Sequence, residues 1–342
     1  MPTPPALRTI GSRAVRVGAL VLLFIVLNLP SWATPHAAEA ATVTELAKLV
    51  ASDGAAGDGF GYSIAIDGDS AVMGAHGDGG AQGAAYVFIR DGDTWSQQAK
   101  LTASDGAAGD FFGISVAISG DSVLVGAYGD GGARGAAYVF TRSGTTWSQQ
   151  AKLTASDGEA NHHFGNSVAV SGDTAVVGAH AASFTGLSQT GTAYVYVRSG
   201  GTWSGQQKLN PSNSEGVHEF GISVAISGDT AVVGAHHDQV KDPGQEEGGI
   251  LGQGAAHVFV RSGDTWSQQA KLVASDGEVN DNLGISVAIS GDTVVAGAYT
   301  DDVGGNVNQG AGYVFMRSGT TWSEQSKLTA SDGAASDFFG NS

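Results

Sequence analysis

The chain has 342 residues, of which 53 are glycine and 42% are hydrophobic, and this composition is typical of neither a disordered nor a collagen-like protein. Its 33 acidic residues outnumber 16 basic ones, giving a net charge of −17, and so acidic a surface repels nucleic acid and anionic lipid. The absence of cysteine excludes disulfides, thiolate catalysis and thiolate metal sites.

Residues 1–33 have the pattern of a secretory signal peptide. Basic residues up to Arg16 precede an apolar run, residues 19–29, that is too short to cross a bilayer, and small residues then lead to Ala33. A second small-residue site ends at Ala40, and an uncleaved membrane anchor is the alternative. We expect the remaining residues, 42–342, to form one domain that is secreted, extracellular or on the cell surface, with no membrane insertion after signal cleavage.

A short sequence motif then recurs along the chain. A Phe-Gly step stands at intervals of 52, 52, 56, 63 and 56 residues, with Leu-Gly once, at Phe60, Phe112, Phe164, Phe220, Leu283 and Phe339. Such self-similarity is typical of repeat architectures, here five complete repeats and the start of a sixth.

Each repeat predicts four short strands separated by turns. In the second repeat they are residues 114–119, 122–127, 136–142 and about 146–155, and no segment has the pattern of a long helix. A four-stranded antiparallel unit of this size cannot bury its faces alone, so neighbouring units must stack. We therefore predict an all-β fold, a β-propeller whose blades are four-stranded antiparallel sheets.

The two ends of the repeat region predict an incomplete propeller. Residues 46–53 have the pattern of a fourth strand, with no first three strands before them, and the sequence ends where a sixth first strand should begin. We expect a domain truncated at its C-terminus, with a parent of six or seven blades. A closed five-bladed ring with a spare strand is the alternative.

The recurring pairs Phe112-Gly113 and Gly126-Ala127, followed by Tyr138-Val-Phe, resemble FG-GAP repeats, the blades of the integrin α-subunit propeller, in their bacterial secreted form. The resemblance implies a propeller, most often seven-bladed, and extracellular recognition or adhesion. Many such repeats carry an aspartate-rich calcium loop between the first two strands. Here that connection is only Ser119-Gly120-Asp121, a tight turn that cannot supply six to eight oxygen ligands.

Two sets of aspartates recur in turns. Those of the short Gly-Asp hairpins are expected to pair with the arginines that end the third strands, namely Arg90, Arg142, Arg198, Arg261 and Arg317. A second set forms pairs in the loops between repeats: Asp53/Asp58, Asp105/Asp110, Asp276/Asp281 and Asp332/Asp337. Turn closure is the favoured interpretation of these pairs, and a divalent ion such as calcium is the alternative.

Loop lengths identify a candidate functional face. In a meander, the loops between the second and third strands lie at the same end as the loops between repeats, and length variation is concentrated there, in residues 180–191, 236–254 and 299–310. Candidate ligand-binding residues on this face are His76, Tyr128, His180, His236, His237, Asp238 and Tyr299. The rings that directly follow Gly-Ala, one in each repeat, suit sugars or peptide side chains, and packing at the blade rim is the alternative.

Histidines gather in the same loops. The candidate metal ligands, for zinc or another divalent ion, are His162, His163, His180, His218, His236 and His237. The alternative is that they are solvated loop residues whose adjacent His-His pairs point to opposite sides. No spacing motif such as His-Glu-x-x-His is present, so no cofactor is assigned from the sequence.

The sequence favours a binding or adhesion module for an extracellular protein or glycan, rather than an enzyme, because no recognisable nucleophile or phosphate motif is present. The alternatives are a glycoside hydrolase that uses acidic residues of the same face, and a purely structural surface scaffold.

Overall fold

A computed structural model describes residues 45–182, 190–212, 218–240 and 252–342. The chain divides into two units, Met1–Glu45 and Leu46–Ser342, and all the described strands belong to the second. The predicted signal peptide, with its cleavage sites at residues 33 and 40, lies outside the described residues. In the described ranges, no helix combines the length and apolar character needed to span a bilayer.

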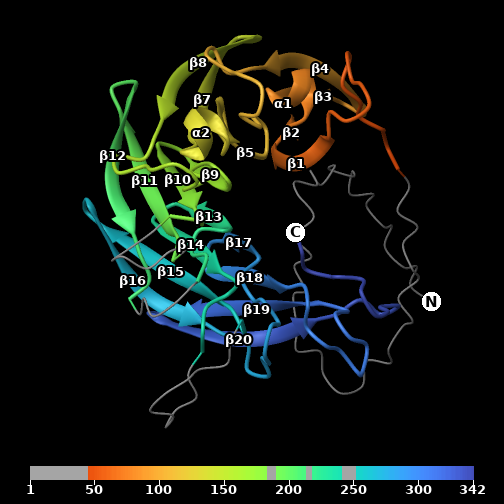
Figure 1. Cartoon of the computed structure of the whole chain (residues 1–342), viewed down its shortest axis with the longest axis vertical. Helices are drawn as coiled ribbons and strands as arrows, with labels where there is room; N and C mark the ends of the chain where they lie inside the picture. The colour runs from red at the N-terminus through yellow and green to blue at the C-terminus, as the bar shows by residue number, and fades with distance from the viewer. Residues whose placement is uncertain (1–44, 183–189, 213–217, 241–251) are drawn as a thin grey trace, which may run out of the picture. The chain divides into compact units, whose positions relative to one another are not determined.

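The described strands form five four-stranded antiparallel sheets, each in chain order, which we call blades 1 to 5 (Figure 1). Blades 1 and 2 consist of β1 (Phe60–Asp67), β2 (Ser70–Ala75), β3 (Ala84–Asp91), β4 (Thr94–Leu101), and β5 (Ser115–Ser119), β6 (Ser122–Ala127), β7 (Ala136–Ser143), β8 (Thr146–Leu153). Blades 3 to 5 consist of β9 (Val168–Ser171), β10 (Thr174–Ala179), β11 (Thr192–Ser199), β12 (Thr202–Leu209); β13 (Val224–Ser227), β14 (Thr230–Ala235), β15 (Ala255–Ser262), β16 (Thr265–Leu272); and β17 (Ser286–Ser290), β18 (Thr293–Ala298), β19 (Ala311–Ser318), β20 (Thr321–Leu328). The predicted all-β fold of propeller blades is confirmed.

The blades stack through their faces. The first strands of successive blades, β1, β5, β9, β13 and β17, contact one another. Core clusters are shared between neighbours, so that Val72 and Val87 of blade 1 pack in one cluster with Val123 and Tyr138 of blade 2. The second strands are the most buried, and every residue of β6 is buried. The core therefore lies between blades, as expected of units that cannot bury their faces alone.

The Phe-Gly and Gly-Ala pairs join each blade to the next. A Cβ on Gly126 of blade 2 would lie only 1.9 Å from the carbonyl oxygen of Gly165 in blade 3, and that oxygen accepts a 2.8 Å hydrogen bond from the Ser115 hydroxyl. Phe112 is fully buried and packs edge-on against Tyr138, with ring centroids 5.5 Å apart. The motif is thus a packing device at the blade junctions, where only glycine permits the close approach of two backbones.

The outer strands carry a second junction. Arg142 pairs with Asp121 at 2.7 Å and lies over the Trp147 ring, whose indole nitrogen donates a 2.8 Å hydrogen bond to Gln98 of the preceding blade. The predicted pairing of hairpin aspartates with strand-ending arginines is confirmed in all five blades: Asp69–Arg90, Asp121–Arg142, Asp173–Arg198, Asp229–Arg261 and Asp292–Arg317.

One local prediction was wrong, and one local feature was not predicted. Residues 46–53 form no strand, because a fourth strand pairs with the third strand of its own blade and the described residues, which begin at 45, contain none before it. Leu49 and Ala51 instead pack against the core of blade 1. The feature that was not predicted is a pair of short helical turns, α1 (Asp78–Ala81) and α2 (Asp130–Ala133). Both turns contain glycines at positive φ. In a sequence, such glycine pairs are typical of loops rather than of helices.

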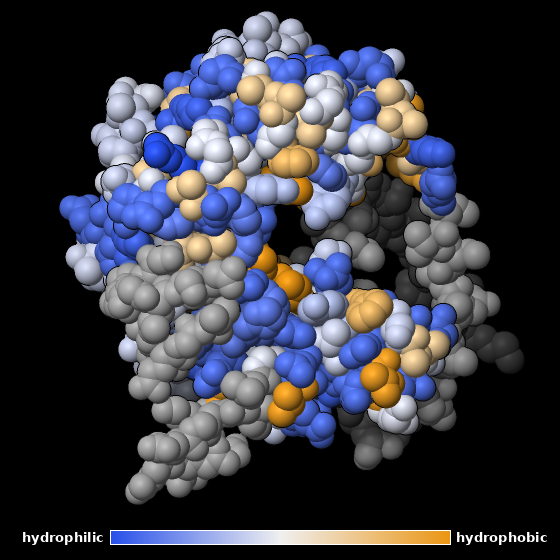
Figure 2. Space-filling model, in the orientation of Figure 1, coloured by the Kyte–Doolittle hydropathy of each residue, from blue (hydrophilic) through white to orange (hydrophobic). Residues whose placement is uncertain are grey.

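Apolar side chains are exposed on the faces of blades 1 and 5 that no described blade covers. They include Tyr62, Ile64 and Ile66 of β1, whereas Ile118, which is equivalent to Ile66 in blade 2, is buried. On the side of the molecule drawn in Figure 2, the surface is mostly hydrophilic and its apolar patches are small and separate.

Candidate functional site

The antiparallel order of the strands places the loops between the second and third strands beside the loops that join successive blades. Backbone hydrogen bonds connect the two sets, for example from the Gly129 amide to the Asp110 carbonyl at 3.1 Å. We call this end of the blades the variable-loop face. Parts of its longer loops, residues 183–189 and 241–251, lie outside the described residues.

In blades 2 to 4, the candidate residues after the Gly-Ala pairs have partners that the sequence did not pair with them, although His163 was a candidate metal ligand. These partners precede each Phe-Gly step, and in blades 2 to 4 they are Phe111, His163 and Glu219. All three have positive φ, between 51° and 57°, a backbone conformation that aims the side chain at the residue after Gly-Ala in the same blade. Their constant position before Phe-Gly is the signal that could have found them.

In blades 1 to 3 the aromatic and imidazole members of the two sets, together with Tyr62, form a row of rings. Phe111 stacks on Tyr128 with centroids 5.1 Å apart and planes 4° from parallel. Contacts with centroids 4.4 to 6.2 Å apart continue this arrangement in both directions, and we call the six residues the ring row: Tyr62, His76, Phe111, Tyr128, His163 and His180. Of the other predicted ligand-binding residues, Tyr299 packs against Phe338 at 5.9 Å.

The row is followed in blade 4 by a cluster of one carboxylate and two imidazoles. The Glu219 carboxylate oxygens lie 3.6 Å from His236 Nε2 and 3.4 Å from His237 Nδ1, and the two imidazole centroids are 4.0 Å apart. The alternative that these adjacent histidines point to opposite sides therefore does not hold. We call Glu219, His236 and His237 the blade-4 cluster.

Burial keeps His236 and His180 uncharged at neutral pH. It lowers the pKa of His236 to about 3, with further contributions from His237 and His180, and it lowers the pKa of His180 to about 4, with a contribution from His163. Imidazoles that are neutral at pH 7 present lone pairs rather than positive charge.

Two predicted residues form a separate buried site. Asp238 is fully buried and lies 2.9 Å from His218 Nδ1, 2.8 Å from His257 Nε2 and 3.0 Å from Lys271 Nζ. Burial opposes ionisation of this carboxyl, but the bonds to His218 and His257 outweigh it and lower its pKa. Burial also lowers the pKa of His257. Asp238 is thus an internal anion that holds blade 4 together, and it does not join the blade-4 cluster.

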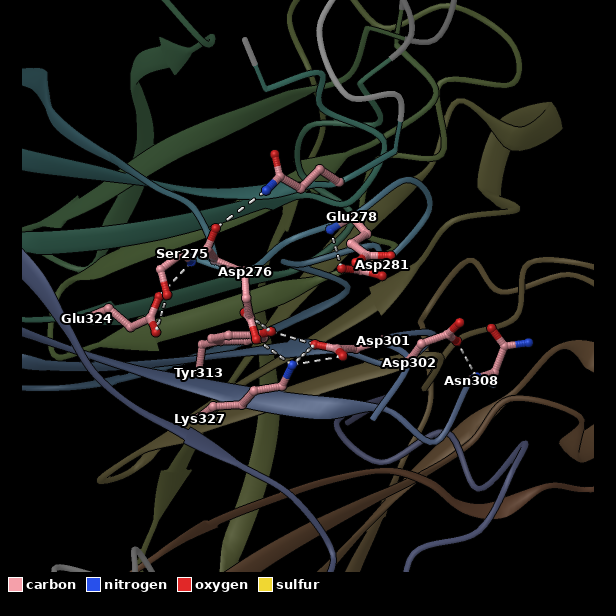
Figure 3. Close-up of polar contacts among 12 residues, drawn as sticks. Ser275, Asp276, Glu278, Asp281, Asp301, Asp302, Asn308, Tyr313, Glu324 and Lys327 are labelled. Carbon is pink, nitrogen blue, oxygen red and sulfur yellow. Dashed lines mark hydrogen bonds and ion pairs between the residues drawn. The ribbon is translucent and has the colours of Figure 1, made fainter. Parts of the chain in front are cut away.

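The same position in other blades holds a tyrosine, two aspartates and a lysine, which we call a tetrad. Tyr138 donates to Asp130 at 2.6 Å and lies 2.9 Å from Asp105, while Lys152 contacts both carboxylates at 2.7 Å. Figure 3 shows the blade-5 tetrad, in which four side chains from different loops and strands converge. The complete tetrads are Asp53–Asp78–Tyr86–Lys100, Asp105–Asp130–Tyr138–Lys152 and Asp276–Asp301–Tyr313–Lys327.

The recurring aspartate pairs divide between two tasks. In three of the four pairs the first member, Asp53, Asp105 or Asp276, joins a tetrad. The second member closes a turn: the Asp110 carboxylate accepts the Ala107 amide at 2.7 Å. His162 closes the equivalent turn in blade 3, where its Nδ1 accepts the Glu159 amide at 3.1 Å. The turn interpretation is confirmed for Asp58, Asp110, Asp281 and Asp337.

The repeat is also recognised by comparison with known proteins. The model of the FG-GAP repeat matches six segments: residues 43–88, 95–140, 147–196, 203–259, 266–315 and 322–342. The chain belongs to the FG-GAP repeat family. No curated protein matches it significantly. FG-GAP repeats form propellers that often serve ligand binding or adhesion, and they are typical of extracellular or surface proteins.

Proposed function

We propose that this FG-GAP propeller is a secreted or cell-surface binding module that recognises an extracellular protein or glycan through its variable-loop face, and that it is not an enzyme. The observation that carries the proposal is the ring row, in which aromatic and imidazole rings, half-buried except for the exposed Tyr62, run across three consecutive blades. Rings held by their neighbours offer contact area with little loss of conformational entropy, which is why aromatic residues dominate binding surfaces.

The surrounding architecture supports a binding role. Five rigid sheets hold the strands, while loop length varies at one end, which is the usual division between scaffold and recognition surface. The net charge of −17 favours neutral or basic ligands over nucleic acid and anionic lipid.

The hydrolase alternative depends on a pair of carboxyl groups with different protonation states. Burial raises the pKa of Asp281 to about 6, the value expected of a general acid. Its carboxylate, however, accepts the Glu278 amide at 2.6 Å, and the nearby Asp301 is bound by Tyr313 and Lys327 (Figure 3). Since both groups already have structural partners, binding is the better proposal.

A glycan and extracellular-matrix protein array tests the proposal. The intact protein is expected to bind a restricted set of ligands, and a Phe111→Leu/Tyr128→Leu variant to lose at least about tenfold in affinity, since each ring contributes on the order of 1 kcal/mol. Trp95→Leu, which removes an aromatic ring from the outer strand β4, is the matched control and should bind normally.

Three results would contradict the proposal. One is an array without any ligand for a folded protein, which would favour a scaffold. Another is equal binding by the ring-row variant and the control. The third is release of reducing sugar from an arrayed glycan, which would favour the hydrolase.

A further inference from the structure

The blade-4 cluster has the composition and spacing of a metal site. Among the described residues, Glu219, His236 and His237 form a group whose three potential ligand atoms all lie within 4.8 Å of one another. Two atoms that are each about 2.1 Å from one ion at a tetrahedral angle lie about 3.4 Å apart. The separations of 3.6 and 3.4 Å between Glu219 and the two imidazoles are close to this value and too long for good hydrogen bonds.

The polar groups of the cluster are not satisfied by the protein alone. His236 is 7% exposed; its Nδ1, like those of His76 and His180, is buried without a hydrogen-bond partner among the described residues, and its Nε2 has only the 3.6 Å contact with Glu219. Buried imidazoles normally have partners at both nitrogens or bind a metal. His162 differs, because its Nδ1 accepts the Glu159 amide.

Blade 4 is the place in the repeat where a carboxylate and imidazoles meet. The position before Phe-Gly and the position after Gly-Ala are occupied by Gly59 and His76 in blade 1, and by His163 and His180 in blade 3. Blade 4 combines Glu219 with His236 and adds His237, so the repeat geometry that builds the ring row elsewhere builds a mixed ligand set here.

We propose that Glu219, His236 and His237 bind one divalent transition-metal ion of the zinc class on the variable-loop face. Two imidazoles and one carboxylate suit zinc, whereas calcium prefers six to eight oxygen ligands. Three protein ligands leave a coordination position for water or for an oxygen of a bound molecule. The side chains of His237 and Glu219 are 44% and 22% exposed, so the site is accessible from solvent.

The test uses the full mature protein after chelation and removal of the chelator, with metal ions alone as the probe. Calorimetric titration with Zn²⁺ is expected to give one site per chain, and Co²⁺ to give the visible absorption of a four-coordinate complex. Glu219→Gln and His237→Ala should each weaken binding by about tenfold or more. His76→Ala is the matched control, because it removes the equivalent imidazole of blade 1, and it should bind as the wild type does.

The inference is wrong if the folded wild type binds no ion stoichiometrically, if Glu219→Gln and His237→Ala both bind like the wild type, or if His76→Ala weakens binding as much as they do. Circular dichroism of each variant establishes that it is folded. Because no organic or protein ligand is used, the result does not depend on the proposed recognition function.

Discussion

Single glycines set how closely the blades approach one another. Gly126 and Gly120 both lie in blade 2, but glycine is required at the two positions for different reasons. Gly126 lies in β6 against the Gly165 carbonyl of the next blade, whereas Gly120 supplies a positive φ of 55° in an open hairpin. The recurring Gly-Ala pair is therefore required for packing between blades, and the recurring Gly-Asp pair for turn geometry.

This difference predicts unequal effects of adding one methyl group. Gly126→Ala should reduce the free energy of unfolding by about 2–3 kcal/mol or more, because the backbone on both sides must move. Gly120→Ala should cost only about 1 kcal/mol, the strain of a left-handed alanine with no steric neighbour. Urea unfolding of the two variants measures both values, and equal losses would contradict this account of the motif.

Asp281 predicts a pH-dependent stability. Its folded pKa of about 6 exceeds the ordinary value of 3.8, mainly because of burial, so ionisation destabilises the fold. This penalty is absent below about pH 3.8, grows between pH 3.8 and 6, and is complete above pH 6. Asp281→Asn should therefore be more stable than the wild type by about 1–2 kcal/mol at pH 7.5. The gain should disappear at pH 4, and a gain that is the same at both pH values would refute the assignment.

At the scale of elements, the tetrads of blades 1, 2 and 5 connect the third and fourth strands to the loops of the variable-loop face. Lys152 on β8 neutralises Asp105 and Asp130, which come from two different loops. The hydrogen bond from Lys152 is the main reason that the pKa of Asp105 lies below its ordinary value. Stability from this bond is present above that ordinary value and is lost as the pH falls through the folded pKa.

Lys152→Met should therefore destabilise the protein by about 2 kcal/mol at pH 7, since two carboxylates lose their shared cation. The loss should shrink at acid pH, where the wild type also loses the bond. Lys48→Met, at an exposed position before blade 1, is the control for removing a positive charge. Unfolding midpoints in urea at pH 7 and pH 3 provide the measurement, and a loss no larger than that of Lys48→Met would refute the role of the tetrad.

At the scale of the whole molecule, the repeat made the fold predictable. Strand order, the hairpins and the Arg–Asp pairs follow from a sequence pattern that recurs five times. The bounds of β6, 122–127, are the predicted ones. The ring row was predicted in part: Phe111 was missed, and His163 was expected only as a metal ligand, because the positive φ of both residues cannot be seen in the sequence. Asp238 and His237 are neighbours in sequence, yet Asp238 lies in a buried ion pair and His237 lies in the solvent-accessible blade-4 cluster.

Blade stacking predicts that the same substitution at equivalent positions of two blades lowers the free energy of unfolding by different amounts. Ile118 is 9% exposed between blades 1 and 2, whereas Ile66, its counterpart in blade 1, is 44% exposed. Ile118→Ala should lower the free energy of unfolding by about 2–4 kcal/mol, and Ile66→Ala should lower it by less than half as much. Equal losses in urea unfolding would show that the exposed face of blade 1 is covered in solution.

The central claim is that the variable-loop face binds the ligand, and matched arginine substitutions at exposed loop positions test it most directly. Ala107→Arg places a bulky side chain on that face, and Thr145→Arg places the same side chain in a hairpin at the opposite end of the same blade. Binding of both variants to the ligands that the array identifies is the measurement. The account predicts that Ala107→Arg abolishes or strongly weakens binding while Thr145→Arg leaves it unchanged; the reverse result would place the binding site on the other face.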